Sequence, residues 1–235
     1  MTRVYLSPSA QIQNAYAGQD TNEQAQCNRI AEYARKALEK NGFTVNKAPQ
    51  GQGYTTNTAH SNTWDADVHI AIHTNAGGGR GCEVYAWSGS LADRYVKAVY
   101  AAVDAVVENP GRGIKIGNHL HEITATKAVC VYVECEFHDN VQGAKWIMDN
   151  AQVLGEAIAR GVCTAEGRAY RPLDEAKPVL PPPKPPDPAV KYFRVRTSWA
   201  DAKSQIGAYV SLENARRAAA AANPYKVYDS TGKQV

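Results

Sequence analysis

Short apolar runs alternate with longer amphipathic stretches through the first 162 residues of the chain. A continuous apolar run is typical of a buried strand, whereas apolar residues spaced three or four apart are typical of a helix that packs along one face. The pattern predicts strands at residues 4–7, 43–46, 68–72, 83–87 and 128–133, and helices at residues 21–38, 54–64, 91–107, 141–148 and 151–162. This alternation predicts an α/β fold, a mostly parallel twisted sheet flanked by helices on both faces.

Local signals mark the ends of the first helix. Thr21 is followed three positions later by Gln24, the spacing of a capping box, and Asn41-Gly42 supplies a stop. By contrast, residues 112–126 show no clear period and are expected to be irregular.

The composition changes after residue 167. Residues 178–188 contain seven prolines, which form neither a helix nor a central strand and instead favour a stiff, extended segment. We therefore predict a large first domain at residues 1–167, a Pro-rich linker at 168–190 and a small α+β C-terminal domain at 191–235. In that last domain we expect strands at 192–196 and 225–228 and one helix at 212–222, laid on a small antiparallel sheet.

Charge, hydropathy and cysteine content limit the classes of partner and the cellular compartment that we expect. The 235 residues carry a formal net charge of +3, and no Lys/Arg run is interleaved with aromatic residues, so a nucleic-acid partner is not expected. No apolar run reaches the length of a membrane span, and the first residues lack a signal-peptide pattern, so we expect synthesis in the cytoplasm. The five cysteines contain no C-x-x-C pair, which favours buried, reduced thiols.

Side chains that could bind a metal or take part in catalysis lie mainly where predicted strands end. His73 and Asn75 follow the apolar strand 68–72, just before three glycines; Glu134 follows strand 128–133, and Glu23 stands in the first turn of the first helix. Ligands bind outside the carboxyl ends of parallel strands, so these groups are expected to converge. Two carboxylates and one imidazole suit a hydrolytic metal site, in which a further acid moves protons.

Each residue also has a purely structural interpretation. His73 can be a hydrogen-bonded histidine at a strand end, and Glu134 can pair with an arginine such as Arg112. Glu23 can simply complement the helix dipole. Taken together at one edge of the sheet, the three residues favour a functional site.

The residues around these positions resemble a known family. The run VHIAIHTNAGGG (68–79), the helix-opening Glu23 and the run VYVECEFHDN (131–140) are similar to the type 3 N-acetylmuramoyl-L-alanine amidases, zinc enzymes of peptidoglycan turnover and of phage endolysins. The resemblance implies that Glu23 and His73 bind Zn²⁺ and that Glu134 is the catalytic glutamate. It implies hydrolysis of the amide between N-acetylmuramic acid and L-alanine. Asn75 and the glycine loop, Gly78 included, either hold substrate or only form the turn.

One feature departs from the family pattern. Its first zinc-binding histidine usually follows strand one, where this chain has the sequence LSPSAQ at residues 6–11. Gln11 is the nearest group that could offer an oxygen to the metal, followed by Asn14. A histidine from elsewhere could also fill the place, and His138 is preferred over the remaining candidates, which are His60, His119 and His121.

The C-terminal segments FRVR (193–196) and SQIGAY (204–209) resemble a sporulation-related repeat (SPOR) module, which implies binding to peptidoglycan; a dimerisation or stability module is the alternative. The whole chain would then be a modular endolysin that acts at the bacterial wall after release, with no membrane partner. Two alternatives stay open. One is an inactive peptidoglycan-binding protein that has lost its metal site. The other is a cysteine hydrolase that uses Cys82 or Cys135 with His73 or His138.

Overall fold

The computed structural model describes residues 1–173, 193–201, 204, 207–209, 212–221 and 224–235. The chain divides into two compact units, Met1–Pro183 and Lys184–Val235, and each is described by itself. Within the described ranges, no helix combines the length and the apolar character needed to cross a membrane. The Pro-rich segment predicted at 168–190 lies outside the described residues from position 174 onward.

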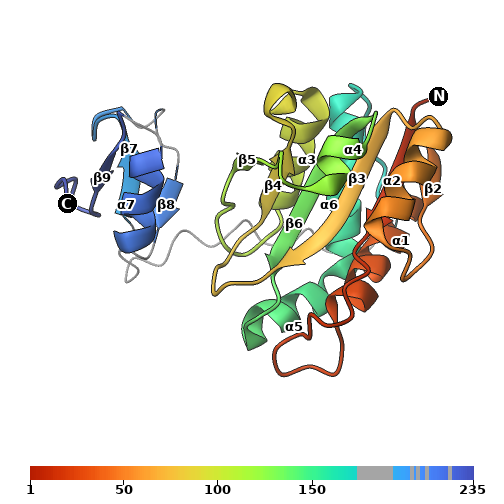
Figure 1. Cartoon of the computed structure of the whole chain (residues 1–235), viewed down its shortest axis with the longest axis horizontal. Helices are drawn as coiled ribbons and strands as arrows, with labels where there is room; N and C mark the ends of the chain where they lie inside the picture. The colour runs from red at the N-terminus through yellow and green to blue at the C-terminus, as the bar shows by residue number, and fades with distance from the viewer. Residues whose placement is uncertain (174–192, 202–203, 205–206, 210–211, 222–223) are drawn as a thin grey trace. The chain divides into compact units, whose positions relative to one another are not determined.

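The first unit is built on a six-stranded sheet of order β2-β1-β3-β6-β4-β5. Four parallel strands form one side of it: β1 (Arg3–Pro8), β2 (Thr44–Lys47), β3 (Val68–Asn75) and β6 (Val129–Phe137). β4 (Glu83–Ala86) runs antiparallel to β6 and pairs with the short parallel strand β5 (Ile114–Ile116). The predicted α/β class with a mostly parallel sheet is confirmed (Figure 1).

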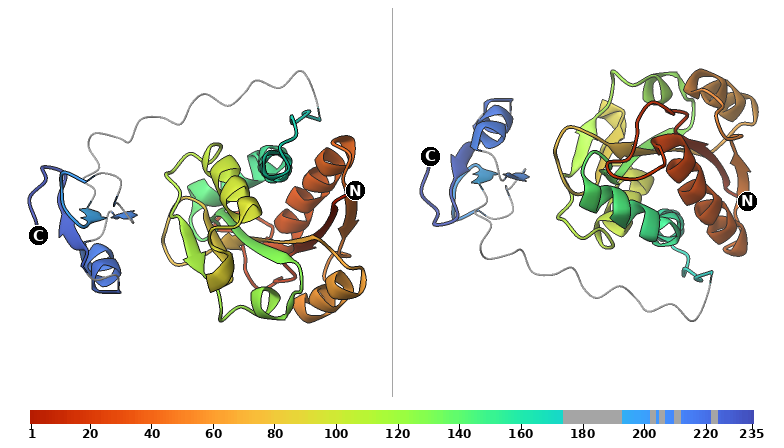
Figure 2. Two further views of the ribbon diagram at one scale, coloured as in Figure 1. Left: turned by 90° about the horizontal axis from the view of Figure 1, so that it is seen from above. Right: turned by 90° about the horizontal axis from the view of Figure 1, so that it is seen from below.

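Helices cover the sheet unevenly. One face packs against α1 (Glu23–Lys40), α3 (Arg94–Asp104), α5 (Val141–Asp149) and α6 (Ala151–Ala165). The other face carries the shorter helices α2 (Tyr54–Thr63) and α4 (His121–Ala125), and a 3₁₀ turn at Ser88–Ser90 follows β4 (Figure 2). Because two short helices cannot cover a six-stranded sheet, part of this second face is left for polar side chains.

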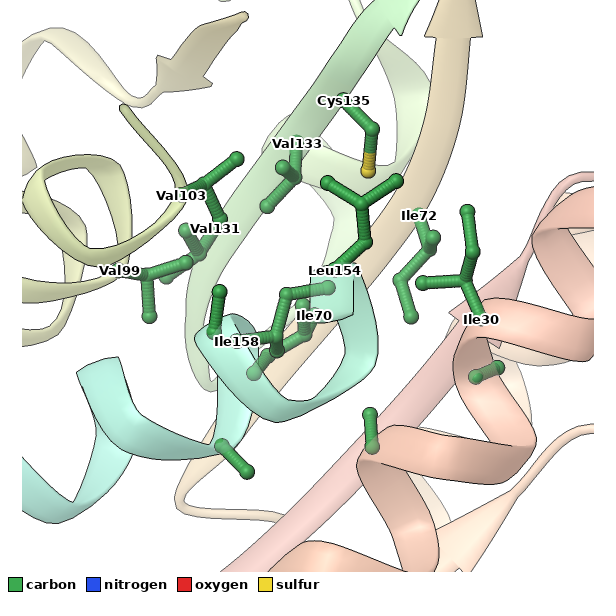
Figure 3. Packing of buried hydrophobic residues seen from close by; sticks show 14 of the residues in the cluster. Ile30, Ile70, Ile72, Val99, Val103, Val131, Val133, Cys135, Leu154 and Ile158 are labelled. Carbon is green, nitrogen blue, oxygen red and sulfur yellow. The ribbon is translucent and has the colours of Figure 1, made fainter. Parts of the chain in front are cut away.

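The main core lies between the sheet and the four long helices. Figure 3 shows Ile70, Ile72, Val131 and Val133 of the two central strands directed toward Leu154 of α6. Leu154 is fully buried, and burying a leucine side chain stabilises a fold by about 1.5–3 kcal/mol. Successive strand side chains point to opposite faces, so the residues between these apolar ones face away from α6.

Glycine allows α6 to approach α1 closely. A Cβ built on Gly155 would lie 2.6 Å from the carbonyl oxygen of Ile30 and 2.7 Å from the amide nitrogen of Ala34. Gly155→Ala is therefore expected to lower the free energy of unfolding by about 1–3 kcal/mol through overpacking, although alanine favours helix. Urea unfolding measures the change.

Gly53 offers a matched control, because a Cβ there meets nothing within 4 Å. Gly53→Ala should leave the urea midpoint nearly unchanged. If Gly155→Ala proves as stable as Gly53→Ala, the close packing of α6 on α1 is not what the glycine provides.

Several element ends differ from the sequence prediction. The N-cap of α1 is Asn22, whose Oδ1 accepts the Ala25 amide at 3.0 Å, so the Thr21–Gln24 capping box is wrong; the Thr21 hydroxyl instead accepts from Gln26. β3 and β6 continue to Asn75 and Phe137, because both still pair in the sheet beyond their apolar runs. The stretch 112–126, expected to be irregular, holds β5 and α4.

Residues 168–173 pack against the first unit. Tyr170 donates to Glu156 at 2.6 Å, and the Arg171 amide donates to Asn41 at 2.8 Å. The Lys40 ammonium donates to the carbonyls of residues 172 and 173. The first unit therefore includes at least residues 1–173.

The second unit has a three-stranded antiparallel sheet of order β8-β7-β9, formed by β7 (Phe193–Arg196), β8 (Gly207–Tyr209) and β9 (Lys226–Tyr228). Among the described residues of this unit, one helix, α7 (Leu212–Ala221), accompanies the sheet, and Val195, Ala215 and Val227 form the buried core. One helix on a small antiparallel sheet matches the architecture expected for this region.

Candidate functional site

The site lies on the sheet face opposite α6. His73 of β3 is the register partner of Glu134 of β6, and Glu134 is in turn the partner of Glu83 of β4. Side chains at paired positions share a face, so these three neighbours line up across three strands. Sequence positions 73, 83 and 134 are thus brought together by strand pairing alone.

Glu23 and His73 form a buried pair. Oε1 of Glu23 lies 2.8 Å from Nδ1 of His73, and Oε2 accepts from the Asn14 amide at 2.6 Å. Glu23 is 1% exposed and His73 is 7% exposed. The His73 ring also stacks on Tyr132, with centroids 4.4 Å apart, which fixes its plane.

The electrostatics of this pair favour two charged groups. Burial alone would raise the pKa of Glu23, but the hydrogen bond and charge of His73, with Asn14 and Ser9, lower it below the usual value. Burial likewise opposes the charged form of His73, but the surrounding carboxylates Glu122, Glu23 and Glu134 raise its pKa to about 10. A divalent cation between the two would replace the shared proton.

The pKa of Glu134, unlike that of Glu23, is raised. Burial, together with the charges of Glu23 and Glu83, raises its pKa to about 8, against the opposing influence of His73 and Lys115. Its Oε2 is buried and has no hydrogen-bond partner. A carboxylate with one free buried oxygen and a pKa near neutrality is suited to accept and return a proton.

The pair fits part of a metal site. A neutral imidazole and a carboxylate are ordinary zinc ligands. Glu134, the register partner of His73, adds a buried oxygen that has no hydrogen-bond partner. Across the described residues, however, no group of three or more His, Cys, Asp or Glu side chains is arranged to hold a metal ion. The structure therefore brings together two side chains, Glu23 and His73, of the types that bind zinc.

Gln11 and His138, the other predicted ligands, lie in different surroundings. Gln11 Oε1 accepts from Asn14 at 3.0 Å, and the same Asn14 amide contacts Glu23, so Gln11 is one side chain removed from the pair. His138 is buried; its Nδ1 lies 2.9 Å from the Thr74 hydroxyl, and its ring stacks on Tyr16. Both stay predictions.

The three remaining histidines are exposed. His60 contacts Gln52, His119 meets the edge of Tyr85, and His121 packs near Tyr54. None has a contact with Glu23 or His73 in the described part of the chain.

The predicted substrate groups already have partners. The Asn75 amide donates to Glu83 at 2.8 Å, and Glu83 also binds Arg112, Lys115 and Tyr85. Arg112 therefore pairs with Glu83, the register neighbour of Glu134.

The loop after β3 is held from within the chain. The amides of Gly77 and Gly78 both donate to Asp139 at 2.7 Å. Both glycines have positive φ, which gives the amides this direction. The turn interpretation accounts for these contacts, and a role for Gly78 in substrate binding stays a prediction.

Glu122 was missed by the sequence analysis. It is 3% exposed, lies on α4 and accepts from Ser7 and from His69, whose Nε2 is 3.0 Å away. Its second oxygen lies 3.7 Å from Nε2 of His73. A signal was present: His69 is a polar residue inside an apolar strand, on the same face as His73, and a buried histidine requires a partner.

The cysteine alternative is not supported by the structure. All five cysteines are free and buried, as predicted. Cys82 and Cys135 belong to the apolar core, and burial raises the pKa of both thiols, which suppresses the reactive thiolate. Figure 3 shows Cys135 near Val133 and Leu154, within the apolar core.

Comparison with known proteins identifies the family. Residues 12–164, more than half of the chain, match the family model described as N-acetylmuramoyl-L-alanine amidase. The chain belongs to this amidase family. The matched region contains Glu23, His73, Glu122 and Glu134, and it begins just after Gln11, in the loop where the first histidine is missing.

Individual amidases are similar over the same region. The amidase CwlM of Bacillus licheniformis is 32% identical over 118 residues, which are 49% of this chain and 46% of CwlM. A sporulation-specific amidase of Bacillus subtilis is 31% identical over 115 residues, 48% of this chain and 44% of that protein. The amidase-family chain thus aligns with somewhat less than half the length of these relatives.

A solved structure supports the fold. The catalytic domain of CwlV from Bacillus (Paenibacillus) polymyxa var. colistinus superposes with a TM-score of 0.63 at 19% identity, covering 72% of this chain and all of that domain. The amidase fold therefore occupies the first unit.

Proposed function

We propose that the chain is a zinc-dependent N-acetylmuramoyl-L-alanine amidase that hydrolyses peptidoglycan between N-acetylmuramic acid and the L-alanine of the stem peptide. The observation that carries the proposal is the convergence of Glu23, His73 and Glu134, which come from three segments separated by at least 50 residues. A purely structural role would not require a carboxylate with an unpartnered buried oxygen beside a buried histidine–glutamate pair.

Two of the residues present, Glu23 and His73, are of types that bind Zn²⁺. Glu23 and His73 would hold it, with the Gln11 carboxamide as the nearest further oxygen, linked to Glu23 through Asn14. When bound, zinc polarises a carbonyl and lowers the pKa of water. The Nδ1 atom of His73 and Oε1 of Glu23 lie 2.8 Å apart, so both can reach one ion with little rearrangement.

Glu134 performs the proton transfers in this proposal. Its free Oε2 accepts a proton from the attacking water, and the protonated carboxyl then donates that proton to the departing L-alanine amine. The raised pKa suits both steps, because the group binds and releases a proton close to neutral pH. Tyr132, stacked on His73, closes one side of the site and keeps the ring from turning.

Hydrolysis can be tested directly. Purified protein is incubated with isolated peptidoglycan, and free L-alanine amino groups are counted before chelation, after chelation and after zinc is restored. The proposal requires release that the chelator stops and zinc recovers. Wall binding without amino-group release, even with added zinc, would favour the inactive binding protein instead.

The second unit is proposed to bind peptidoglycan as a SPOR-like module. The support is its order of elements, one helix with a three-stranded antiparallel sheet, together with the FRVR and SQIGAY segments. Joined through the Pro-rich segment, such a module would raise the concentration of the catalytic unit at an insoluble substrate. This arrangement suits an endolysin that is made in the cytoplasm and reaches the wall after release, the role we propose for the whole chain.

Removing the second unit should separate binding from catalysis. A truncation to residues 1–173 keeps the contacts of Tyr170 and Arg171, and it is expected to hydrolyse soluble muropeptides at the full rate. On whole walls its rate should fall by about 10-fold or more at low enzyme concentration, because the tether is lost. Turbidity loss of wall suspensions measures this, and equal lysis by both forms would remove the case for a tether.

A further inference from the structure

Glu122 is the centre of a buried polar cluster beside the proposed zinc site. Its Oε1 accepts from the Ser7 hydroxyl of β1 and lies 3.0 Å from Nε2 of His69 of β3. Asn57 of α2 in turn donates to the Ser7 oxygen at 2.8 Å. Side chains from β1, β3 and α2 thus fix the direction of one carboxylate of α4 that no step of the proposed reaction uses.

The free oxygen of this carboxylate points at His73. Oε2 of Glu122 lies 3.7 Å from Nε2 of His73, whereas Oε1 of Glu23 lies 2.8 Å from Nδ1 of the same ring. The two nitrogens of an imidazole diverge, so the two carboxylates occupy different sides of His73. A metal ion held by Glu23 and Nδ1 is therefore out of reach of Glu122.

We propose that Glu122 is a positioning residue: its carboxylate, 3.7 Å from Nε2 of His73, favours a proton on that nitrogen and so directs the Nδ1 lone pair toward Glu23 and the metal. The proposal rests on the zinc site of the proposed function. An imidazole ligand needs one deprotonated nitrogen facing the metal, and a carboxylate on the other nitrogen selects that tautomer and makes the ring more basic.

His69 and Ser7 act on His73 only through Glu122. His69 Nδ1 is buried without a hydrogen-bond partner, so the tautomer that suits it carries its proton on Nε2 and donates to Oε1 of Glu122. Its ring stacks on Tyr5, with centroids 5.4 Å apart, which prevents it from turning away. With Oε1 held by these donors, Oε2 is the acceptor left for His73.

The variant Glu122→Gln tests the role. A glutamine keeps the size but has a single acceptor oxygen, so its amide NH₂ must face either His69 or His73, each of which offers an N–H. We expect zinc affinity, measured by competition with a chelator, to fall by about 10- to 100-fold. Glu122→Asp, which keeps the charge, should recover part of the loss.

Glu166→Gln is the matched control. Glu166 is also a part-buried carboxylate that accepts from hydroxyls, those of Thr2 and Tyr95, but at the opposite, amino end of β1. Its variant should bind zinc with unchanged affinity. A merely structural role for Glu122 predicts that Glu122→Gln lowers the melting temperature equally with and without zinc, whereas positioning predicts that the zinc-induced increase itself shrinks.

A spectroscopic readout decides the geometry. In the zinc-loaded wild type, ¹⁵N spectra of the imidazoles should show His73 protonated at Nε2 and metal-bound at Nδ1, with an Nε2 proton that exchanges faster in Glu122→Gln. Metal on Nε2, or a lower ligand number of Co²⁺ in Glu122→Gln, would mean that Glu122 is itself a ligand and would overturn the proposal. If Glu122→Gln does not fold, His69→Gln replaces it with the same expectation.

Zinc binding can be measured independently of catalysis. A chain that binds zinc with the His73 tautomer described above but releases no L-alanine would refute the proposed function and leave this inference intact. A wild-type chain that binds no zinc would overturn the inference.

Discussion

Glu134→Gln is expected to reduce the release of L-alanine amino groups by about 10³-fold, while zinc content and wall binding stay at wild-type levels. Glutamine keeps the size of the side chain but cannot take a proton from water. Because Glu134 is the register partner of His73 rather than a contact of Glu23, its loss removes no ligand of the proposed metal. Activity assays and zinc analysis on the same preparation check both parts.

Stability provides the control for this variant. In the metal-free protein, the pKa of Glu134 is raised to about 8, so the folded state holds a proton that the unfolded chain has already lost. Wild-type stability should therefore fall relative to Glu134→Gln as the pH rises from about 5 to about 9. Urea unfolding at both pH values measures it; a variant that is inactive because it is unfolded would show no cooperative transition at either pH.

His73→Gln is expected to remove both zinc and hydrolysis. The variant loses one of the two proposed ligands and leaves the buried carboxylate of Glu23 without its main partner. Zinc affinity should drop by more than the roughly 100-fold upper value expected for loss of an outer partner such as Glu122. Zinc content after gel filtration and the amino-group assay give the two readouts.

His60→Gln is the companion to this experiment. His60 is an exposed histidine that contacts Gln52, so its replacement should change neither zinc content nor rate. Zinc retained by His73→Gln at full stoichiometry would contradict the proposed ligand pair. Together, the variants of Glu134, His73 and Glu122 should give three distinct combinations of activity and zinc affinity.

The regular elements could be predicted because their burial is periodic. The apolar run around Ile70 and Ile72, and the repeat of Ile30, Ala34 and Leu38 along α1, indicate which residues meet the core. The residues at which the strands end were harder to predict from the sequence. Backbone pairing continues through His73 and Glu134 after the apolar pattern has stopped, and pairing depends on a partner strand that no local pattern shows.

The site was predictable only in part, for a related reason. Glu23 opens α1, and His73 and Glu134 lie toward the carboxyl ends of β3 and β6, so the α/β topology brings them to one edge. Glu122 lies on a five-residue helix, too short to show a period, and its importance comes from contacts with positions 7, 69 and 73. The prediction of the N-cap of α1 was wrong for a similar reason. Asn22 and Thr21 both have suitable side chains, and the backbone geometry determines which of them caps the helix.

The position of β6 has a consequence for biosynthesis. It is the last strand of the large sheet to leave the ribosome, yet it lies between β3 and β4 and is the only link between the β2-β1-β3 and β4-β5 groups within the described sheet. A nascent chain that ends before residue 129 therefore has two separate sets of strands with open edges, which invite wrong pairing. The same strand carries Glu134, so the strand that completes the sheet also delivers the proposed base, and catalytic competence arrives no earlier than the finished fold.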